Sequence, residues 1–236
     1  MAGLPLRSGF STTKVAFCMS PKPSTRERIL QASLELFNAQ GERSVTTNHI
    51  AAHLEISPGN LYYYFRNKQA IIAELFDRYE VAVDGFLQVP EGRAVTMDDK
   101  TVYLESLLSA MWDYRFLHRD LEHLLGGDEA LAGRYRLFSA RCLKNAQAIY
   151  QGFVDAGILR MGAKEIEALT LNAWIVATSW VRFLGTNGER DFDLVALRQG
   201  VYQLLALEFG YLADDVKGQV TMLAGSFLAR PQVTVN

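Results

Sequence analysis

One stretch, residues 45–68, constrains the fold of this chain more than any other. It reads VTTNHIAAHLEISPGNLYYYFRNK, and its apolar spacing predicts two short helices joined by a tight turn. Thr46 or Thr47 can cap the first helix by accepting a hydrogen bond from a free backbone N–H. The apolar residues of this helix share one face, which we expect to pack inward: Ile50, Ala51 and Leu54.

The second short helix begins at a strong start signal. Ser57 is a good N-cap, and Pro58 follows at the first helical position, where its missing N–H costs nothing. Leu61 and Phe65 are four residues apart and face the core. The outer face keeps small polar and aromatic groups, namely Ser57, Gly59, Asn60, Tyr62 and Tyr63. This arrangement predicts a helix–turn–helix, which places its second helix in the DNA major groove.

The pattern TTxxIAxxLxISPGxLYYYFxxK, which begins at Thr46, resembles the DNA-binding domain of the TetR family of one-component transcriptional regulators. The resemblance runs from about Thr25 to Leu75. It departs from the family at Glu55, where the turn usually has Gly. A longer side chain should be tolerated there if its φ is negative, so the departure affects the turn geometry and not the assignment. Nothing past Leu75 carries a motif. For the remainder, the resemblance implies an all-helical ligand-binding and dimerisation domain.

The expected DNA contacts fall into two groups. Asn can bond bidentately to adenine, whereas hydroxyl groups reach either bases or phosphates. The residues expected to face bases are Asn48, Ser57, Pro58, Gly59, Asn60 and Tyr63. The residues expected to hold phosphates are Thr47, Tyr62, Tyr64 and Lys68, and Thr46 belongs to the same DNA-binding surface.

Charge is distributed unevenly along the 236 residues, although the net charge is only −2. Residues 1–68 hold 8 basic and 4 acidic side chains, which gives +4. The remainder holds 24 − 8 = 16 basic and 26 − 4 = 22 acidic side chains, which gives −6. A basic head on an acidic body is typical of a DNA-binding domain with a separate sensor domain. Chance segregation also produces a difference of this size.

The cysteine and hydropathy patterns predict a cytoplasmic protein. Cys18 and Cys142 form no CxxC motif, which fits a reducing compartment. No apolar run reaches the ~20 residues that a membrane span needs. Residues 1–19 lack the continuous apolar segment of a signal peptide. We expect residues 1–22 to be a flexible N-terminal extension, of which 1–18 are either a misassigned upstream segment or a flexible arm.

The helical periodicity predicts an all-α chain. We expect an N-terminal three-helix helix–turn–helix domain over 23–68 and a larger helical domain over 69–236. Beyond the two short helices, the expected helices span 25–40, 67–87, 97–114, a short segment ending at 125, 128–156, 163–185, 193–213 and 215–228. No strand-like alternation of useful length occurs.

An enzyme is a weaker hypothesis. His49 and His53 are four residues apart, which is a metal-like spacing, but no nearby Cys or carboxylate pair completes a site. His118 and Glu122 are expected to be a surface pair. The segment 118–120 reads HRD as in kinases, but the other kinase motifs are absent, as are GxSxG, Walker and HExxH motifs. We therefore predict no enzymatic activity, no cofactor and no metal.

Aromatic residues of the larger domain indicate an effector pocket, with a plain aromatic core as the alternative. Pockets between bundle helices are lined mostly by apolar and aromatic groups with a few polar ones. The expected lining residues are Trp112, Phe116, Phe138, Tyr150, Trp174 and Thr178. Asn172 and Ser179 are polar groups in an otherwise apolar helix, so they line the same pocket or a subunit interface.

The resemblance implies a homodimer, because two-fold symmetry doubles the contacts of a helix–turn–helix on a palindromic operator. The helices expected to dimerise are 163–185 and 193–213. The expected interface residues are Val201, Leu204, Leu205, Glu208, Phe209 and Leu212. We expect a repressor that a small, largely apolar effector bound within 96–213 releases from DNA. The alternatives are a TetR-like activator, a co-repressor mode, or a helical partner-binding protein with a non-functional helix–turn–helix.

Overall fold

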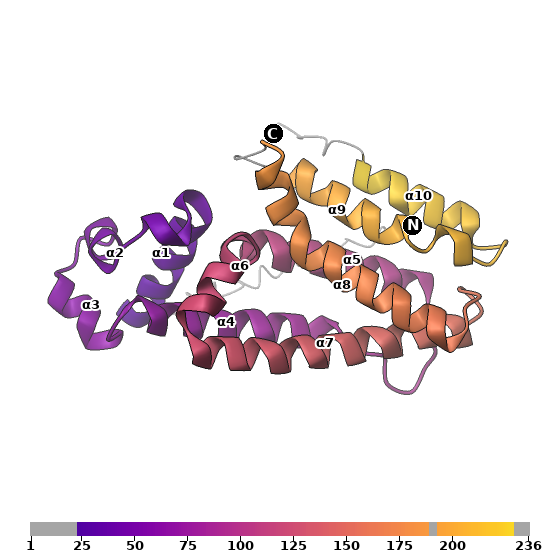
Figure 1. Cartoon of the computed structure of the whole chain (residues 1–236), viewed down its shortest axis with the longest axis horizontal. Coiled ribbons are helices and arrows are strands. Elements are labelled where there is room, and N and C mark those ends of the chain that lie inside the picture. Colours follow the sequence, from indigo (N-terminus) through magenta and orange to yellow (C-terminus); the bar gives the residue numbers. More distant parts are fainter. Residues whose placement is uncertain (1–22, 189–192, 229–236) are drawn as a thin grey trace, which may run out of the picture.

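The structure is a computed structural model that describes residues 23–188 and 193–228. Within these ranges the chain is helical, and β structure is limited to one antiparallel bridge between Leu159 and Leu212 (Figure 1). The all-α prediction is therefore confirmed. The predicted N-terminal extension, with Cys18, lies outside the described residues. No helix within the described ranges is long and apolar enough to cross a membrane.

The N-terminal part contains three helices and one 3-10 turn: α1 (Thr25–Gln40), η1 (Glu42–Ser44), α2 (Thr47–His53) and α3 (Pro58–Tyr64). The Ser24 hydroxyl caps α1 by accepting a hydrogen bond from the backbone N–H of Glu27 at 3.2 Å. Gly41 ends α1 with a φ of 88°. The inward face of α1 is buried as its periodicity predicts, at Ile29, Ala32, Ser33, Leu36 and Phe37.

Over residues 68–188 and 193–228, the larger part contains seven helices and one 3-10 turn. These are α4 (Lys68–Phe86), α5 (Met97–Asp113), α6 (Arg115–Gly127), α7 (Glu129–Asp155), α8 (Ala163–Thr186), α9 (Leu194–Ala206), η2 (Phe209–Tyr211) and α10 (Lys217–Leu228). Side-chain caps begin several of them, because Asn67, Thr96, Asp128 and Asp193 each accept from a backbone N–H of the first turn. Most of the helix starts predicted from the sequence therefore lie within one or two residues of the observed starts.

The predicted helix 193–213 is too long, because α9 ends at Ala206. The chain after it turns back against the loop between α7 and α8. The Arg160 N–H donates to the Tyr211 carbonyl at 2.7 Å, and the Ala213 N–H donates to the Ile158 carbonyl at 3.0 Å. These non-local hydrogen bonds replace helical ones, which apolar periodicity alone does not reveal.

The apolar core does not divide where the two predicted domains meet. One cluster of buried side chains starts in α1, at Ile29 and Phe37, and continues through α4 to Phe116 and Phe138 in the larger part. A second cluster joins α5, the end of α7, α9 and α10, and includes Phe153 and Leu197. Figure 1 shows α4 running from the N-terminal helices along α7 into the body. The helix–turn–helix is therefore packed onto the body rather than tethered to it.

Candidate DNA-binding surface and effector cavity

The two short helices are held by caps of the predicted kind. The Thr46 hydroxyl accepts from the His49 N–H at 3.2 Å, and the His49 Nδ1 accepts from the Thr46 N–H at 3.4 Å. The Ser57 hydroxyl accepts from the Asn60 N–H at 3.1 Å. His49 thus serves a helix cap. Among the described residues, no group of three or more His, Cys, Asp and Glu side chains is placed to hold a metal ion.

The turn between α2 and α3 does not meet the condition stated for Glu55. Its φ is +56°, in the left-handed region, and not negative. The Ile56 N–H donates to the Ala51 carbonyl at 3.0 Å, so the left-handed residue closes the end of α2 as helix C-terminal turns commonly do. A non-glycine residue in this conformation costs about 1–2 kcal/mol, which explains why glycine is more usual there.

The residues expected to face bases are all exposed: Asn48, Ser57, Pro58, Gly59, Asn60 and Tyr63. Tyr63 has 82% of its surface exposed, which is unusual for a large aromatic side chain. A Cβ on Gly59 would have as its nearest neighbour the Ser57 hydroxyl, at 3.9 Å. Packing within the chain therefore does not require glycine at this position, whereas close approach of another molecule to the backbone would.

Two of the residues expected to hold phosphates, Thr47 and Tyr62, are in direct contact. The Thr47 hydroxyl on α2 and the Tyr62 hydroxyl on α3 share a hydrogen bond of 3.0 Å. Tyr64 is half-exposed, and its ring meets that of Tyr63 edge-on at 5.0 Å between centroids. The tertiary structure thus brings hydroxyl groups from both helices to one edge of the motif.

Lys68 is engaged elsewhere. Its Nζ donates to the carbonyl oxygens of Glu42 and Val45, each at 3.0 Å, and lies 2.6 Å from Glu42 Oε1. An ammonium group has three donors, so these contacts occupy all of them. This geometry makes Lys68 a clamp between η1 and the start of α4, and its predicted phosphate contact stays a prediction. Arg66, which sequence reasoning passed over, is exposed and has no ion-pair partner among the described residues.

A cavity of about 150 Å³ lies in the larger part, between α4, α5, α7 and α8. Four of the six predicted lining residues border it: Phe138, Tyr150, Trp174 and Thr178. The other two do not border it. Phe116 is buried against Phe37, with 5.3 Å between ring centroids, and Trp112 lies under the Arg115 guanidinium. Their positions in the helices were predicted correctly, but their partners depend on helix packing.

His118 closes one end of the cavity, and the predicted surface pair with Glu122 is wrong. His118 is buried, its Nε2 lies 3.1 Å from the Tyr79 hydroxyl, and burial lowers the pKa of its imidazole to about 4. Glu122 is exposed and instead contacts Arg182. The buried Cys142 also borders the cavity, where burial raises the pKa of its thiol to about 12. Both groups are therefore uncharged near neutral pH.

The other end of the cavity holds an ion pair that sequence reasoning missed. The Lys100 ammonium contacts the Glu208 carboxylate, and the two side chains are only 3% and 5% exposed. The ammonium also lies 4.2 Å from the centre of the Phe153 ring. Lys100 shares a helix face with Leu104 and Leu108, which was the available signal that it points inward.

Most of the residues expected at the dimer interface are buried within this protomer. Val201, Leu204, Leu205 and Leu212 are buried within the chain's own second core cluster, and Glu208 pairs with Lys100. Phe209 packs against Tyr202 at 6.2 Å between ring centroids. Large exposed apolar side chains occur instead on α8, at Leu171, Ile175 and Phe183, and on α10, at Met222 and Leu228.

An exposed helix–turn–helix on a larger helical body is the architecture of a DNA-binding transcriptional regulator. A sequence profile described as "Bacterial regulatory proteins, tetR family" matches residues 29–75. A second, described as "Bacterial transcriptional repressor", matches residues 78–220, more than half of the chain. The chain therefore belongs to the TetR family of transcriptional regulators, which are not enzymes.

Known relatives agree with this assignment. The crystal structure of a TetR-family transcriptional regulator from Marinobacter aquaeolei VT8 is 48% identical, with a TM-score of 0.81 over 88% of this chain and 100% of that one. The HTH-type transcriptional regulator UidR of Escherichia coli K12 is 39% identical over 69 residues, 29% of this chain and 35% of UidR. An uncharacterized HTH-type regulator of Xanthobacter autotrophicus is 36% identical over 53 residues, 22% of this chain and 26% of that protein. These two curated matches span 35% or less of each relative's length.

Proposed function

We propose that this protein is a ligand-responsive repressor that binds a palindromic operator as a homodimer in the cytoplasm. A small, largely apolar molecule in the cavity releases it from DNA. The observation that carries this proposal is the course of α4. Its first residue, Lys68, is clamped to the helix–turn–helix, while Tyr79 and Val83, further along it, border the cavity. One helix thus touches both sites.

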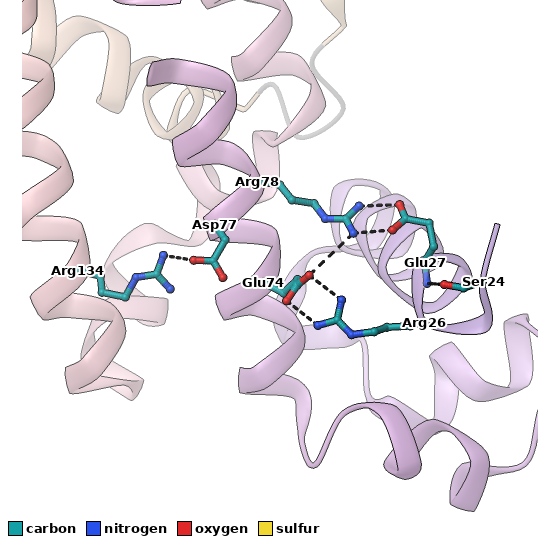
Figure 2. Close-up of polar contacts among 7 residues, drawn as sticks. All are labelled: Ser24, Arg26, Glu27, Glu74, Asp77, Arg78 and Arg134. Atoms are coloured by element: carbon teal, nitrogen blue, oxygen red, sulfur yellow. Dashed lines mark hydrogen bonds and ion pairs between the residues drawn. The ribbon is translucent and has the colours of Figure 1, made fainter. Parts of the chain in front are cut away.

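Ion pairs fix α4 to its neighbours on two sides. Figure 2 shows Arg26 of α1 forming two hydrogen bonds of 2.7 Å with Glu74, and Arg78 forming two of 2.7 and 2.6 Å with Glu27. On the other side, Arg134 of α7 contacts Asp77. Two-pronged guanidinium–carboxylate pairs fix orientation as well as distance. A movement of α4 would therefore carry α1, and the helix–turn–helix packed on it, as a unit.

The energy required for such a switch is small. An effector that prefers the DNA-incompetent state by ~1–3 kcal/mol lowers operator affinity by roughly 5–150-fold. A ligand that contacts Tyr79 or Val83 acts on α4 directly. The measurement is operator affinity with and without a cavity ligand, and unchanged affinity at saturation would contradict the repressor-release mechanism. Tighter binding with ligand would favour the co-repressor mode instead.

We propose that the DNA contacts are made by the exposed face of α2 and α3. Bases would meet Asn48, Ser57, Pro58, Gly59, Asn60 and Tyr63, and phosphates would meet Thr46, Thr47, Tyr62 and Tyr64. Replacing Asn60 by Ala should cost roughly 1–3 kcal/mol on the cognate operator and relax specificity at one base pair. Fluorescence anisotropy with operator and random DNA measures this change. The matched control is Gln199→Ala, at an exposed position of α9. Equal losses on both DNAs would refute a base contact.

We propose that the homodimer forms through the exposed apolar residues of α8, together with α10. Leu171, Ile175 and Phe183 lie at helical spacing on α8 and are about half exposed, at 50%, 51% and 52%. A charge at the centre of such a surface would be buried without a partner. Ile175→Asp should therefore give a monomer in sedimentation. Val102→Asp, at an exposed position of α5, should remain dimeric. A dimeric Ile175→Asp variant would place the interface elsewhere.

A further inference from the structure

The charges around the cavity are confined to one buried pair. Among the lining side chains that the structure describes, the oppositely charged ones are Lys100 and Glu208, which form an ion pair with each other. The remaining lining is largely apolar and aromatic. Tyr150 lies against Glu208, and burial followed by the negative charge of Glu208 raises the pKa of its hydroxyl well above its ordinary value. The cavity as a whole is therefore electrically neutral.

The Lys100 ammonium occupies the place that an organic cation would take. A carboxylate beside an aromatic face is a combination that binds ammonium groups. Here Glu208 supplies the carboxylate and Phe153 the ring, and Lys100 itself lies between them, 4.2 Å from the ring centre. A cationic ligand would meet this ammonium at close range and be repelled.

An anionic ligand meets the opposite obstacle. An anion could pair with the Lys100 ammonium only by separating that ammonium from Glu208, whose side chain is 5% exposed. Breaking a buried ion pair leaves an uncompensated buried charge, which is strongly unfavourable. An uncharged oxygen avoids both problems, because an ammonium has three donors and Glu208 is the one hydrogen-bond acceptor recorded for the Lys100 ammonium among the described residues.

We propose that the Lys100–Glu208 pair is a charge filter, so that the effector is an uncharged, single-ring molecule carrying one hydrogen-bond-accepting oxygen. The size follows from the volume of about 150 Å³, since an apolar cavity of that order in another protein admits benzene. The oxygen accepts from Lys100, and the ring lies among the aromatic side chains towards Trp174. This inference rests on the proposed effector cavity and specifies what that cavity accepts.

Four probes of nearly equal size test the filter on the full-length protein. Acetophenone carries a carbonyl, ethylbenzene has no acceptor, benzoate is an anion and benzylamine is a cation. Calorimetry at pH 7 should show acetophenone binding at least about tenfold tighter than either ion, because the anion has to break the buried pair and the cation is repelled by the Lys100 ammonium. Ethylbenzene should bind about fivefold more weakly than acetophenone, as expected for one lost hydrogen bond. Equal affinity for acetophenone and either ion would overturn the proposal.

Single substitutions should reverse the selectivity in opposite directions. Glu208→Gln leaves the Lys100 ammonium without its carboxylate, so the affinity for benzoate should rise at least about tenfold. Lys100→Met leaves Glu208 beside Phe153, so the affinity for benzylamine should rise instead. The double variant Lys100→Met/Glu208→Met should bind ethylbenzene and acetophenone equally. If folded single variants keep the wild-type ranking, the pair is not the filter; if a variant fails to fold, the wild-type ranking still decides.

These measurements contain no DNA, so they separate the filter from the proposed function. Acetophenone that binds as expected but leaves operator affinity unchanged would refute the release mechanism and leave the filter standing. A protein that binds its operator and none of the four probes would refute the filter and leave DNA binding standing.

Discussion

The buried imidazole of His118 should make the stability of this protein depend on pH in a window where few other groups titrate. Burial lowers the pKa of His118 to about 4, whereas an unfolded chain has a histidine pKa of about 6.5. The unfolded state therefore binds the proton more readily as pH falls. The contribution of His118 to stability is fully present above pH ~6.5 and is lost progressively as pH falls towards 4.

The two pKa values set the size of the effect. Between pH 7.5 and pH 5, linkage predicts a loss of about 2 kcal/mol in the free energy of unfolding from this one group. Urea denaturation of the wild type at both pH values measures the total loss. The variant His118→Gln can still hydrogen-bond the Tyr79 hydroxyl but cannot titrate, so its loss should be about 2 kcal/mol smaller. Parallel losses in the two proteins would show that His118 is not held neutral by the fold.

Three further predictions concern the packing of the body and the salt dependence of DNA binding. Gly200→Ala should lower the free energy of unfolding by about 1–3 kcal/mol in urea denaturation, because the added Cβ would lie 2.5 Å from the Trp180 ring. The control Gly225→Ala has no atom within 4 Å of the new Cβ and should be neutral or stabilising. In operator titrations against salt, Arg66→Met should lower the salt slope by about one. Lys68→Met should weaken binding at an unchanged salt slope, because Lys68 holds η1 to the start of α4. A lower salt slope would instead show that Lys68 contacts a phosphate.

The DNA-binding motif was predictable because its determinants are local. Ser57 and Pro58 fix the start of α3 within a single turn of chain, and Leu61 is four residues from the Ser57 carbonyl that its N–H reaches at 3.2 Å. The conformation of Glu55 was not predictable in the same way. A positive φ at a non-glycine residue is set by the helix end that it closes, and the residue type alone points to the opposite sign.

The contacts of the body were less predictable because they are non-local. The apolar periodicity of α9 correctly shows one buried face, but not whether that face meets the same chain or a second copy. In the structure Val201 and Leu205 pack inside the protomer, which leaves α8 to present the exposed apolar residues. Lys100 illustrates the same limit, since a lysine is normally solvated and its partner Glu208 lies 108 residues away.

The position of Tyr79 connects the packing of α1 with the wall of the cavity. Its ring belongs to the apolar cluster that begins at Ile29 in α1, and its hydroxyl meets His118 at the wall of the cavity. Close-packed interiors respond to a change in volume by shifting between discrete arrangements rather than by yielding gradually. We therefore expect the proposed ligand, beside Tyr79, to act on the packing of α1 and α4 at once. Because that packing and the ion pairs of Arg26 and Arg78 join the same two helices, the proposed signal from the cavity needs no further element to reach the DNA-binding surface.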